Sequence, residues 1–295
     1  MAFTAASFPH ELIREVFLNA KGKSSIAKLS EQTPIAFTGS DLMVFTLDGE
    51  VNIAAEGGAK AQHTGENTVV SIVPIKIEYG QRVSDEFLKA SDEKQLEVLR
   101  AFAEGFSRKV ARGLDIMVMH GTNPKTGTAS AAIGTNSFDT NTSVTPVTYV
   151  PGTPDPEGNI ETAITALGDY DFTGLAMDKT FAGELAKVKV NGVPQYPELT
   201  WGANPDTIHG VDSDVNSTVS AVVGSHAYLG DFKGAFKWGY ADRIDLEVIE
   251  YGDPDNAGSD LKGHNQVYLR AEAWIGWAIL DGAAFARVET TGSGS

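Results

Sequence analysis

Several short motifs place residues at spacings that could do chemistry, and the first of them would bind a phosphate. Gly22-Lys-Ser24 matches the end of a phosphate-binding loop, in which backbone N–H groups and a lysine hold the phosphates. That loop needs another glycine five residues earlier, and this position holds Phe17. A phenylalanine does not give the backbone the freedom to wrap a phosphate, so we exclude a nucleotide site.

Two further motifs contain residue types that bind metal ions. His10-Glu11 begins like a zinc-protease helix, but the second histidine would fall at position 14, which is Arg14. The segment 212–216, Asp-Ser-Asp-Val-Asn, begins like a calcium loop. Its sixth position is Ser217 and its twelfth is Val223, where the loop needs glycine and glutamate. We therefore expect no metal site at either motif.

The remaining candidates for chemistry are weaker. Asp253, Asp255 and Asn256 could hold a cation loosely at the surface, although a solvated turn is the simpler interpretation. The chain has no cysteine, which excludes disulfides, thiolate catalysis and cysteine-bound zinc. No Gly-x-Ser-x-Gly nucleophile motif occurs, and none of the histidines pairs with such a serine. The histidines are His10, His63, His120, His209, His226 and His264. We expect no enzyme, no cofactor and no bound metal.

The composition predicts an acidic, folded chain. With 295 residues, of which 42% are hydrophobic, it can form a large core or two lobes. The net charge of −16 argues against nucleic-acid binding as the main function, and solubility alone explains it. There is no long apolar run and no signal-like N-terminus, so we expect neither a membrane span nor a secretory signal.

The secondary-structure elements of the chain are predicted most clearly near the C-terminus. Residues 236–250 and 266–280 predict two long strands, and the second alternates strictly. Its apolar face carries Val267, Leu269, Ala271, Ala273, Ile275, Trp277 and Ile279. Its other face carries Tyr268 and Trp274, and aromatic residues there indicate a further partner surface, as in an assembly. We expect Trp277 to lie in the core, and Phe236 and Trp274 in the core or at an interface.

A long amphipathic helix is predicted before these strands. Apolar residues recur at spacings of three and four from about 92 to 119, at Leu96, Leu99, Phe102, Ala103, Phe106, Val110, Leu114 and Met117. Such a helix would be roughly 42 Å long. Gly121 would end it.

The N-terminal part predicts a short helix at 11–18 and paired strands. The strands lie at 42–47 with 51–53 and at 68–73 with 75–79, and Pro74 indicates an edge or a bulge. Between them, residues 54–66 are polar and glycine-rich, which predicts a long hairpin tip.

The middle of the chain, residues 122–234, alternates short helices and strands. We predict a helix capped by Asn159 and another from Asp178 to Val188. The predicted strands cover 172–177, 207–211 and 221–224. The tail at 289–295 is low in complexity and predicts disorder.

The order of these elements resembles the major capsid proteins of tailed bacteriophages, which have the HK97-like fold. The resemblance is carried by Arg270-Ala-Glu-Ala273 in the last long strand, by the closing Ala284-Phe-Ala286, and by the order of elements over nearly the whole chain. It implies an α+β fold with an N-terminal arm at 1–40 and strands with an extension loop at 41–76. A peripheral domain at 77–121 and 235–288, with a spine helix and a long sheet, and an axial α/β domain at 122–234 would complete it.

The resemblance also implies which residues contact other subunits. The extension loop reaches over an adjacent subunit in this family, so we expect loop contacts at Glu56, Gly57, Gly58, Lys60 and Glu66, and an interface role for Trp274. Some members join subunits by an isopeptide bond between a loop lysine and an asparagine. Lys60 is the candidate lysine near the tip and Lys76 lies at the base. A plain charge pair is the role we favour for Lys60.

The function implied is a shell protein that assembles in the host cytoplasm as hexamers and pentamers and encloses double-stranded DNA in the virion. Its partners would be further copies, a portal, a decoration protein and a scaffolding protein. Because the chain has no long charged N-terminal extension, either the scaffolding protein is separate or the chain is already trimmed, and Met1 favours the former. DNA would be held without sequence-specific binding, and no membrane is involved. An encapsulin-like bacterial compartment protein is the first alternative. A soluble α+β binding or hydrolytic protein is the second.

Overall fold

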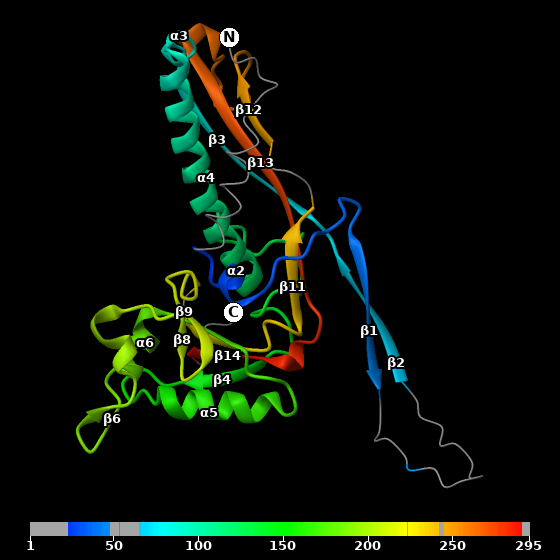
Figure 1. The fold of residues 1–295 in the computed structure, drawn as a ribbon. Helices are drawn as coiled ribbons and strands as arrows, with labels where there is room; N and C mark the ends of the chain where they lie inside the picture. The colour runs from blue at the N-terminus through cyan, green and yellow to red at the C-terminus, as the bar shows by residue number, and fades with distance from the viewer. Residues whose placement is uncertain (1–22, 48–52, 54–64, 223, 242–244, 291–295) are drawn as a thin grey trace.

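The computed structural model describes residues 23–47, 53, 65–222, 224–241 and 245–290, and its architecture is α+β (Figure 1). A long sheet with one long helix along it forms the upper part in this view. A smaller mixed sheet with short helices forms the lower part, and a two-stranded ribbon projects away from both. The predicted helix at 11–18, the hairpin tip at 54–64 and the tail beyond 290 lie outside the described residues.

The long sheet is built around β13 (Gln266–Ile279). Along one edge β13 pairs antiparallel with β3 (Ile75–Ser84), from Gln266 opposite Ser84 to Ile275 opposite Ile75. Along the other edge it pairs antiparallel with β11 (Phe236–Tyr240) and β12 (Asp245–Ile249). The run 236–250, expected to be one strand, is therefore two strands that pair with different parts of β13.

The alternation predicted for β13 is confirmed by burial. Its apolar face, from Val267 to Ile279, is buried, and Trp277 is 1% exposed. The Trp277 indole donates a hydrogen bond to the Asn136 carbonyl at 2.7 Å, so the buried ring has a partner for its one polar group. Phe236 is fully buried in the same core. Both residues are core residues.

The helix α4 (Asp92–His120) packs along this sheet, and the predicted long helix is confirmed. Its 29 residues make it about 44 Å long. Phe102, Phe106 and Leu114 lie on its buried face and join β13 in one hydrophobic core. Gly121 ends the helix in the left-handed conformation with φ of 67°, as a glycine stop does. The short helix α3 (Glu86–Lys89) precedes α4.

The smaller sheet has six strands in the order β4-β14-β10-β5-β9-β8. Their bounds are β4 Thr145–Tyr149, β14 Phe285–Thr290, β10 Ser225–Gly230, β5 Gly174–Met177, β9 Val211–Val215 and β8 Thr207–Ile208. The helices α5 (Pro156–Leu167) and α6 (Lys179–Leu185) close its hydrophobic core. Strand β14 follows β13 in sequence, so the chain passes directly from the long sheet into this one.

All five predicted elements of this part have different bounds. The strand predicted at 172–177 is the shorter β5, and the one predicted at 207–211 is divided between β8 and the start of β9. Helix α5 begins at Pro156, because the Asp155 side chain caps it and accepts a hydrogen bond from the Gly158 N–H. Asn159 lies inside the helix and donates to the Thr148 carbonyl. Helix α6 is capped by Asp178 as predicted, but it ends at 185, where the chain leaves it for the hairpin of β6 and β7. The segment 221–222 forms no strand, since β10 begins only at 225.

The projecting ribbon consists of β1 (Ser40–Leu47) and β2 (Gly65–Ile72), paired antiparallel. Pro74 lies between β2 and β3, where it interrupts no strand. The helix α2 (Ser25–Leu29) packs against α4. The remaining short elements are β6 Lys189–Val190, β7 Val193–Pro194 and the 3-10 turns η1 Pro197–Gly202, η2 Lys262–His264 and η3 Gly282–Ala284. Among the residues described, no helix is both long and apolar enough to span a membrane.

Candidate functional site

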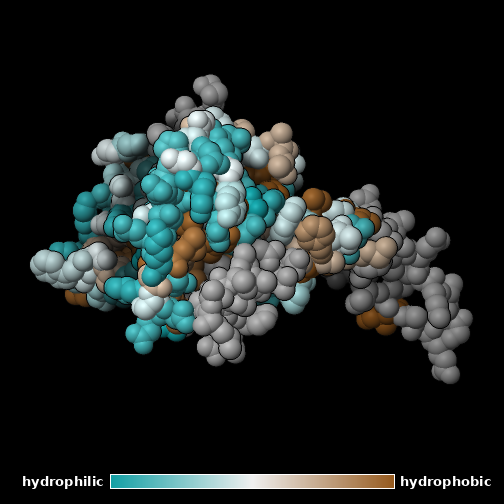
Figure 2. Space-filling view, turned by 90° about the horizontal axis from the view of Figure 1, so that it is seen from above, coloured by the Kyte–Doolittle hydropathy of each residue, from teal (hydrophilic) through white to brown (hydrophobic). Residues whose placement is uncertain are grey.

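The ribbon of β1 and β2 has two faces of different character. On the inner face, Leu42 and Val70 pack against a small core that includes Ile35 and Ile72. On the outer face, Met43 and Val69 stand opposite each other and are 67% and 52% exposed. Figure 2 shows this projection beside the body, with hydrophobic residues at its surface. An exposed apolar pair on a projecting ribbon is typical of a contact with another molecule.

Trp274 lies at the base of the ribbon and is half-buried. Its ring contacts Phe37 edge-to-face with centroids 4.8 Å apart, and the ammonium group of Lys76 lies 6.0 Å from the ring centroid. Lys76 also pairs with Glu272 at 2.9 Å. The second face of β13 thus has partners in its own chain. Phe37 and Val73 remain 54% and 66% exposed, so this base patch (Phe37, Val73 and Trp274) still presents apolar surface.

Of the other residues expected at loop contacts, the structure describes only Glu66. Glu56, Gly57, Gly58 and Lys60 lie outside the described residues. Glu66 belongs to β2, where its backbone pairs with Thr46, so it lies in the strand rather than in the hairpin tip.

A second feature lies at the C-terminal half of α4, where Asp115 is fully buried. Its carboxylate accepts hydrogen bonds from the Ser24 hydroxyl at 2.5 Å, the Thr218 hydroxyl at 2.7 Å and the Asn216 amide at 3.3 Å. The backbone N–H groups of residues 25 and 26 add two more at 3.1 Å. Burial raises the pKa of Asp115 to about 6, and these hydrogen bonds limit the rise.

A second carboxylate, that of Asp214, also binds α2. Asp214 of β9 accepts hydrogen bonds from the Ser25 hydroxyl at 2.6 Å and from the Asn204 amide at 2.9 Å. Lys28 of α2 lies 3.3 Å from the same carboxylate and 3.0 Å from Asp206. The segment 212–216, which resembles the start of a calcium loop, thus lies in strand β9 except for Asn216, which follows it. Asp214 binds α2, and Asn216 binds Asp115.

His120, the last residue of α4, forms a third part of this region. Its Nε2 lies 2.9 Å from the Thr218 carbonyl and its Nδ1 lies 2.7 Å from a carboxylate oxygen of Asp139. The Tyr228 hydroxyl donates to the same carboxylate at 2.7 Å. Burial, followed by the charge of Asp139, raises the pKa of Tyr228 well above its ordinary value, so the hydroxyl keeps its proton. Both ring nitrogens of His120 therefore face acceptor oxygens.

We call this region the buried joint, because it connects α2, α4 and the smaller sheet. Its members are Ser24, Ser25, Asp115, His120, Asp139, Asp214, Thr218 and Tyr228. The sequence predicted no role for His120, which lies at the end of the long helix and pairs with no nucleophilic serine, and no role for Asp115. A signal was present, since Asp115 is the one charged residue in the apolar run 114–119. A charge in such a run is buried at a high cost unless partners satisfy it.

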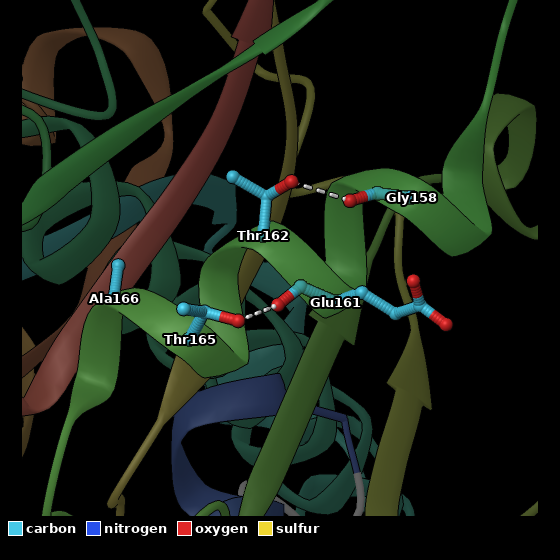
Figure 3. A pocket seen from close by; sticks show the side chains of 5 residues that line it. All are labelled: Gly158, Glu161, Thr162, Thr165 and Ala166. Carbon is cyan, nitrogen blue, oxygen red and sulfur yellow. Dashed lines mark hydrogen bonds between the residues drawn. The ribbon is translucent and has the colours of Figure 1, made fainter.

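Two other candidates prove to be surface features. Asp253 and Asp255 bind Arg82, at 2.6 and 2.5 Å, so their cation is a guanidinium group. The hydrogen bond from Arg82 lowers the pKa of Asp255 to about 2. A shallow depression on α5 is lined by Gly158, Glu161, Thr162, Thr165 and Ala166 (Figure 3). Both threonine hydroxyls donate back to the helix backbone, so neither is directed at a ligand.

Comparisons with known proteins place this fold in a class of shell-forming proteins. A structure from Mycobacterium phage Ogopogo shares 30% identity, covers 91% of this chain and 92% of its own, and superimposes with a TM-score of 0.74. A structure from Gordonia phage Cozz shares 26% identity over 91% and 87%, with a TM-score of 0.73. The capsid of an empty GTA particle shares the fold at 18% identity over 91% and 90%, with a TM-score of 0.64.

The model of the Phage capsid family matches residues 6–290. No curated protein matches this chain significantly. The chain belongs to the Phage capsid family and has the HK97-like fold. It is a major capsid protein whose copies form the shell of the virion. The family and these neighbours are structural proteins of capsids, not enzymes.

Proposed function

We propose that the chain assembles as hexamers and pentamers of an icosahedral shell that encloses double-stranded DNA. Residues 1–40 act as the arm, and residues 41–76 as the ribbon with the extension loop. Residues 77–121 and 235–288 form the peripheral domain and 122–234 the axial domain, with β14 pairing into the axial sheet. The observation that carries the proposal is the apolar outer face of the ribbon, because it projects from a subunit whose family forms shells.

The contacts we propose follow from this geometry. The Met43 and Val69 pair docks on a neighbouring subunit, and the base patch around Trp274 extends that contact. The loop residues Glu56, Gly57, Gly58, Lys60 and Glu66 extend it further, with Lys60 in a charge pair rather than a covalent cross-link. Burial of the exposed parts of Met43 and Val69 would contribute about 2 kcal/mol per contact.

We further propose that assembly takes place in the host cytoplasm with a scaffolding protein and a portal, and that a decoration protein binds the finished shell. No catalytic step is part of this function. DNA is contained without readout of its sequence.

Electron microscopy of the protein, expressed with the genes next to its own, tests the proposal. Wild-type chains should give closed shells, whereas Met43→Asp with Val69→Asp should give soluble, folded chains without shells, because two carboxylates would be desolvated at the contact. Met43→Leu with Val69→Ile is the matched control and should assemble. Shells from the aspartate variant would refute the ribbon contact. A ladder of covalent oligomers on a boiled gel would show that subunits are cross-linked and would bring Lys60 forward as the candidate lysine.

A further inference from the structure

The exposed side of α4 changes its charge along the helix. In the N-terminal half it mixes both signs, at Asp92, Glu93, Lys94, Glu97, Arg100 and Glu104. In the C-terminal half the exposed charges are Arg108, Lys109 and Arg112. Between residues 105 and 128 the sequence has one acidic residue, Asp115, and it is fully buried in the joint. An all-basic surface therefore occurs in a chain whose net charge is −16.

Two lysines extend this surface on either side of the helix. Lys125 is exposed in a loop that packs on α4, where the Pro124 ring lies 3.6 Å from the place of a Cβ on Gly113. Lys23 is exposed directly before Ser24, which binds Asp115. We call the five cations Lys23, Arg108, Lys109, Arg112 and Lys125 the basic surface.

The basic surface has no counter-charge, unlike several other cations of the chain. Lys28 is paired with Asp206 and Asp214, and Lys233 with Asp212 at 2.7 Å. Within the described ranges, none of the five cations of the basic surface forms an ion pair. Their positive charge is therefore available to an external anion.

The chemistry around these cations decides which anion fits. Contacts between protein subunits have an apolar centre. The ribbon has one, but among the residues described no large hydrophobic side chain is exposed between 105 and 128. A hydrated polyanion needs no such centre. Arg108 and Arg112 lie about 6 Å apart along the helix axis, which is close to two phosphate steps of about 3.4 Å on one DNA strand.

We propose that the basic surface binds the phosphate backbone of packaged double-stranded DNA and faces the interior of the shell. This inference rests on the proposed function, in which the shell encloses DNA. The contact is electrostatic and does not read sequence, because it uses no base edge.

The test measures the affinity of the full-length, unassembled chain for a short duplex DNA as a function of salt, by fluorescence anisotropy. The variant R108Q/K109Q/R112Q removes three cations of the basic surface. The control K89Q/K94Q/K187Q removes three exposed lysines that pair with Asp85, Glu97 and Glu184. Both variants change the net charge equally, so bulk repulsion from DNA is matched between them.

We expect the first variant to lose about tenfold or more in affinity at low salt, with a salt slope reduced by roughly 2 to 3. The control should lose much less. Equal losses in both variants, or no loss in the first, would overturn the inference. So would loss of shell assembly with unchanged DNA affinity, since the surface would then contact another copy. Urea unfolding of both variants should match the wild type, because the altered side chains are exposed.

The failure of this inference can be told apart from failure of the proposed function. Wild-type particles that contain DNA while the basic-surface variant binds DNA normally would refute the contact alone. Wild-type particles that never contain DNA would refute the proposed function, whatever the affinity of the unassembled chain.

Discussion

The buried joint and the ribbon place opposite kinds of side chain in unfavourable surroundings. In the joint, Asp115 is a charge placed where water is absent, and five hydrogen bonds from the same chain satisfy it. In the ribbon, Met43 and Val69 are apolar side chains placed in water. The joint is complete within one subunit, whereas the outer face of the ribbon gains energy only when another surface covers it.

This difference separates two kinds of effect. A substitution in the joint should lower the stability of the unassembled chain, because partners in the same chain lose their hydrogen bonds. A substitution on the outer face of the ribbon should leave that stability unchanged and reduce assembly. A joint substitution that reduces assembly without lowering stability, or a ribbon substitution that lowers the stability of the unassembled chain, would contradict this distinction.

The largest expected effect is at Asp115. Asp115→Ala removes the acceptor for the Ser24 and Thr218 hydroxyls and for two backbone N–H groups of α2. Since buried donors without a partner are costly, we expect a loss of about 3 to 5 kcal/mol in the free energy of unfolding. Urea unfolding of the unassembled chain measures it.

The matched control is an aspartate of the ribbon. Asp41 is exposed and accepts a hydrogen bond from Ser71 at 2.6 Å. Because water replaces that bond, Asp41→Ala should cost less than about 1 kcal/mol. Similar losses for the two variants would mean that the burial of Asp115 does not determine its contribution.

The pH dependence of stability gives the next effect. The pKa of Asp115 is raised to about 6 in the folded chain, above its value in the unfolded chain. The folded chain therefore holds this proton more tightly, so the contribution of Asp115 to stability is fully present below pH ~4 and falls as pH rises through 6. The loss amounts to roughly 3 kcal/mol. Above that range the contribution stays constant.

Asp115→Asn isolates this contribution, because the amide does not titrate. We expect the difference in unfolding free energy between wild type and Asp115→Asn to change between pH ~4 and ~6.5. Asp214 and His120, which share Ser25 and Thr218 with Asp115, are unchanged between the two proteins. A difference that is flat with pH would contradict the raised pKa.

Two neighbouring positions of β1 allow the buried and exposed faces of the ribbon to be compared within a single strand. Leu42 faces the small core and Met43 faces solvent, because side chains alternate along a strand. Leu42→Asp should cost about 2 kcal/mol in the unassembled chain, whereas Met43→Asp should stay within about 0.5 kcal/mol. Urea unfolding measures both. Equal costs would mean that the two faces are not distinct.

The sequence predicted the long elements well, because their periodicity extends over many residues. The burial of β13 and the length of α4 follow from repeats of two and of three to four. The start of α5 was misplaced because two side chains near it can cap a helix, and only the fold shows that Asp155 does so. The partners of Asp115 lie about 90 to 100 residues away, so no local pattern could reveal them.

The smallest expected effect is at Lys76, which lies where the ribbon meets the long sheet. It pairs with Glu272 at 2.9 Å, and both side chains are partly exposed, at 41% and 21%. Water screens such a pair, so Lys76→Met should change the free energy of unfolding by less than about 1 kcal/mol. Because the ammonium group also lies over Trp274, tryptophan fluorescence should shift while the urea midpoint hardly moves. A loss in the free energy of unfolding as large as that of Asp115→Ala would contradict this expectation. It would mean that the base patch, like the joint, stabilises the isolated subunit.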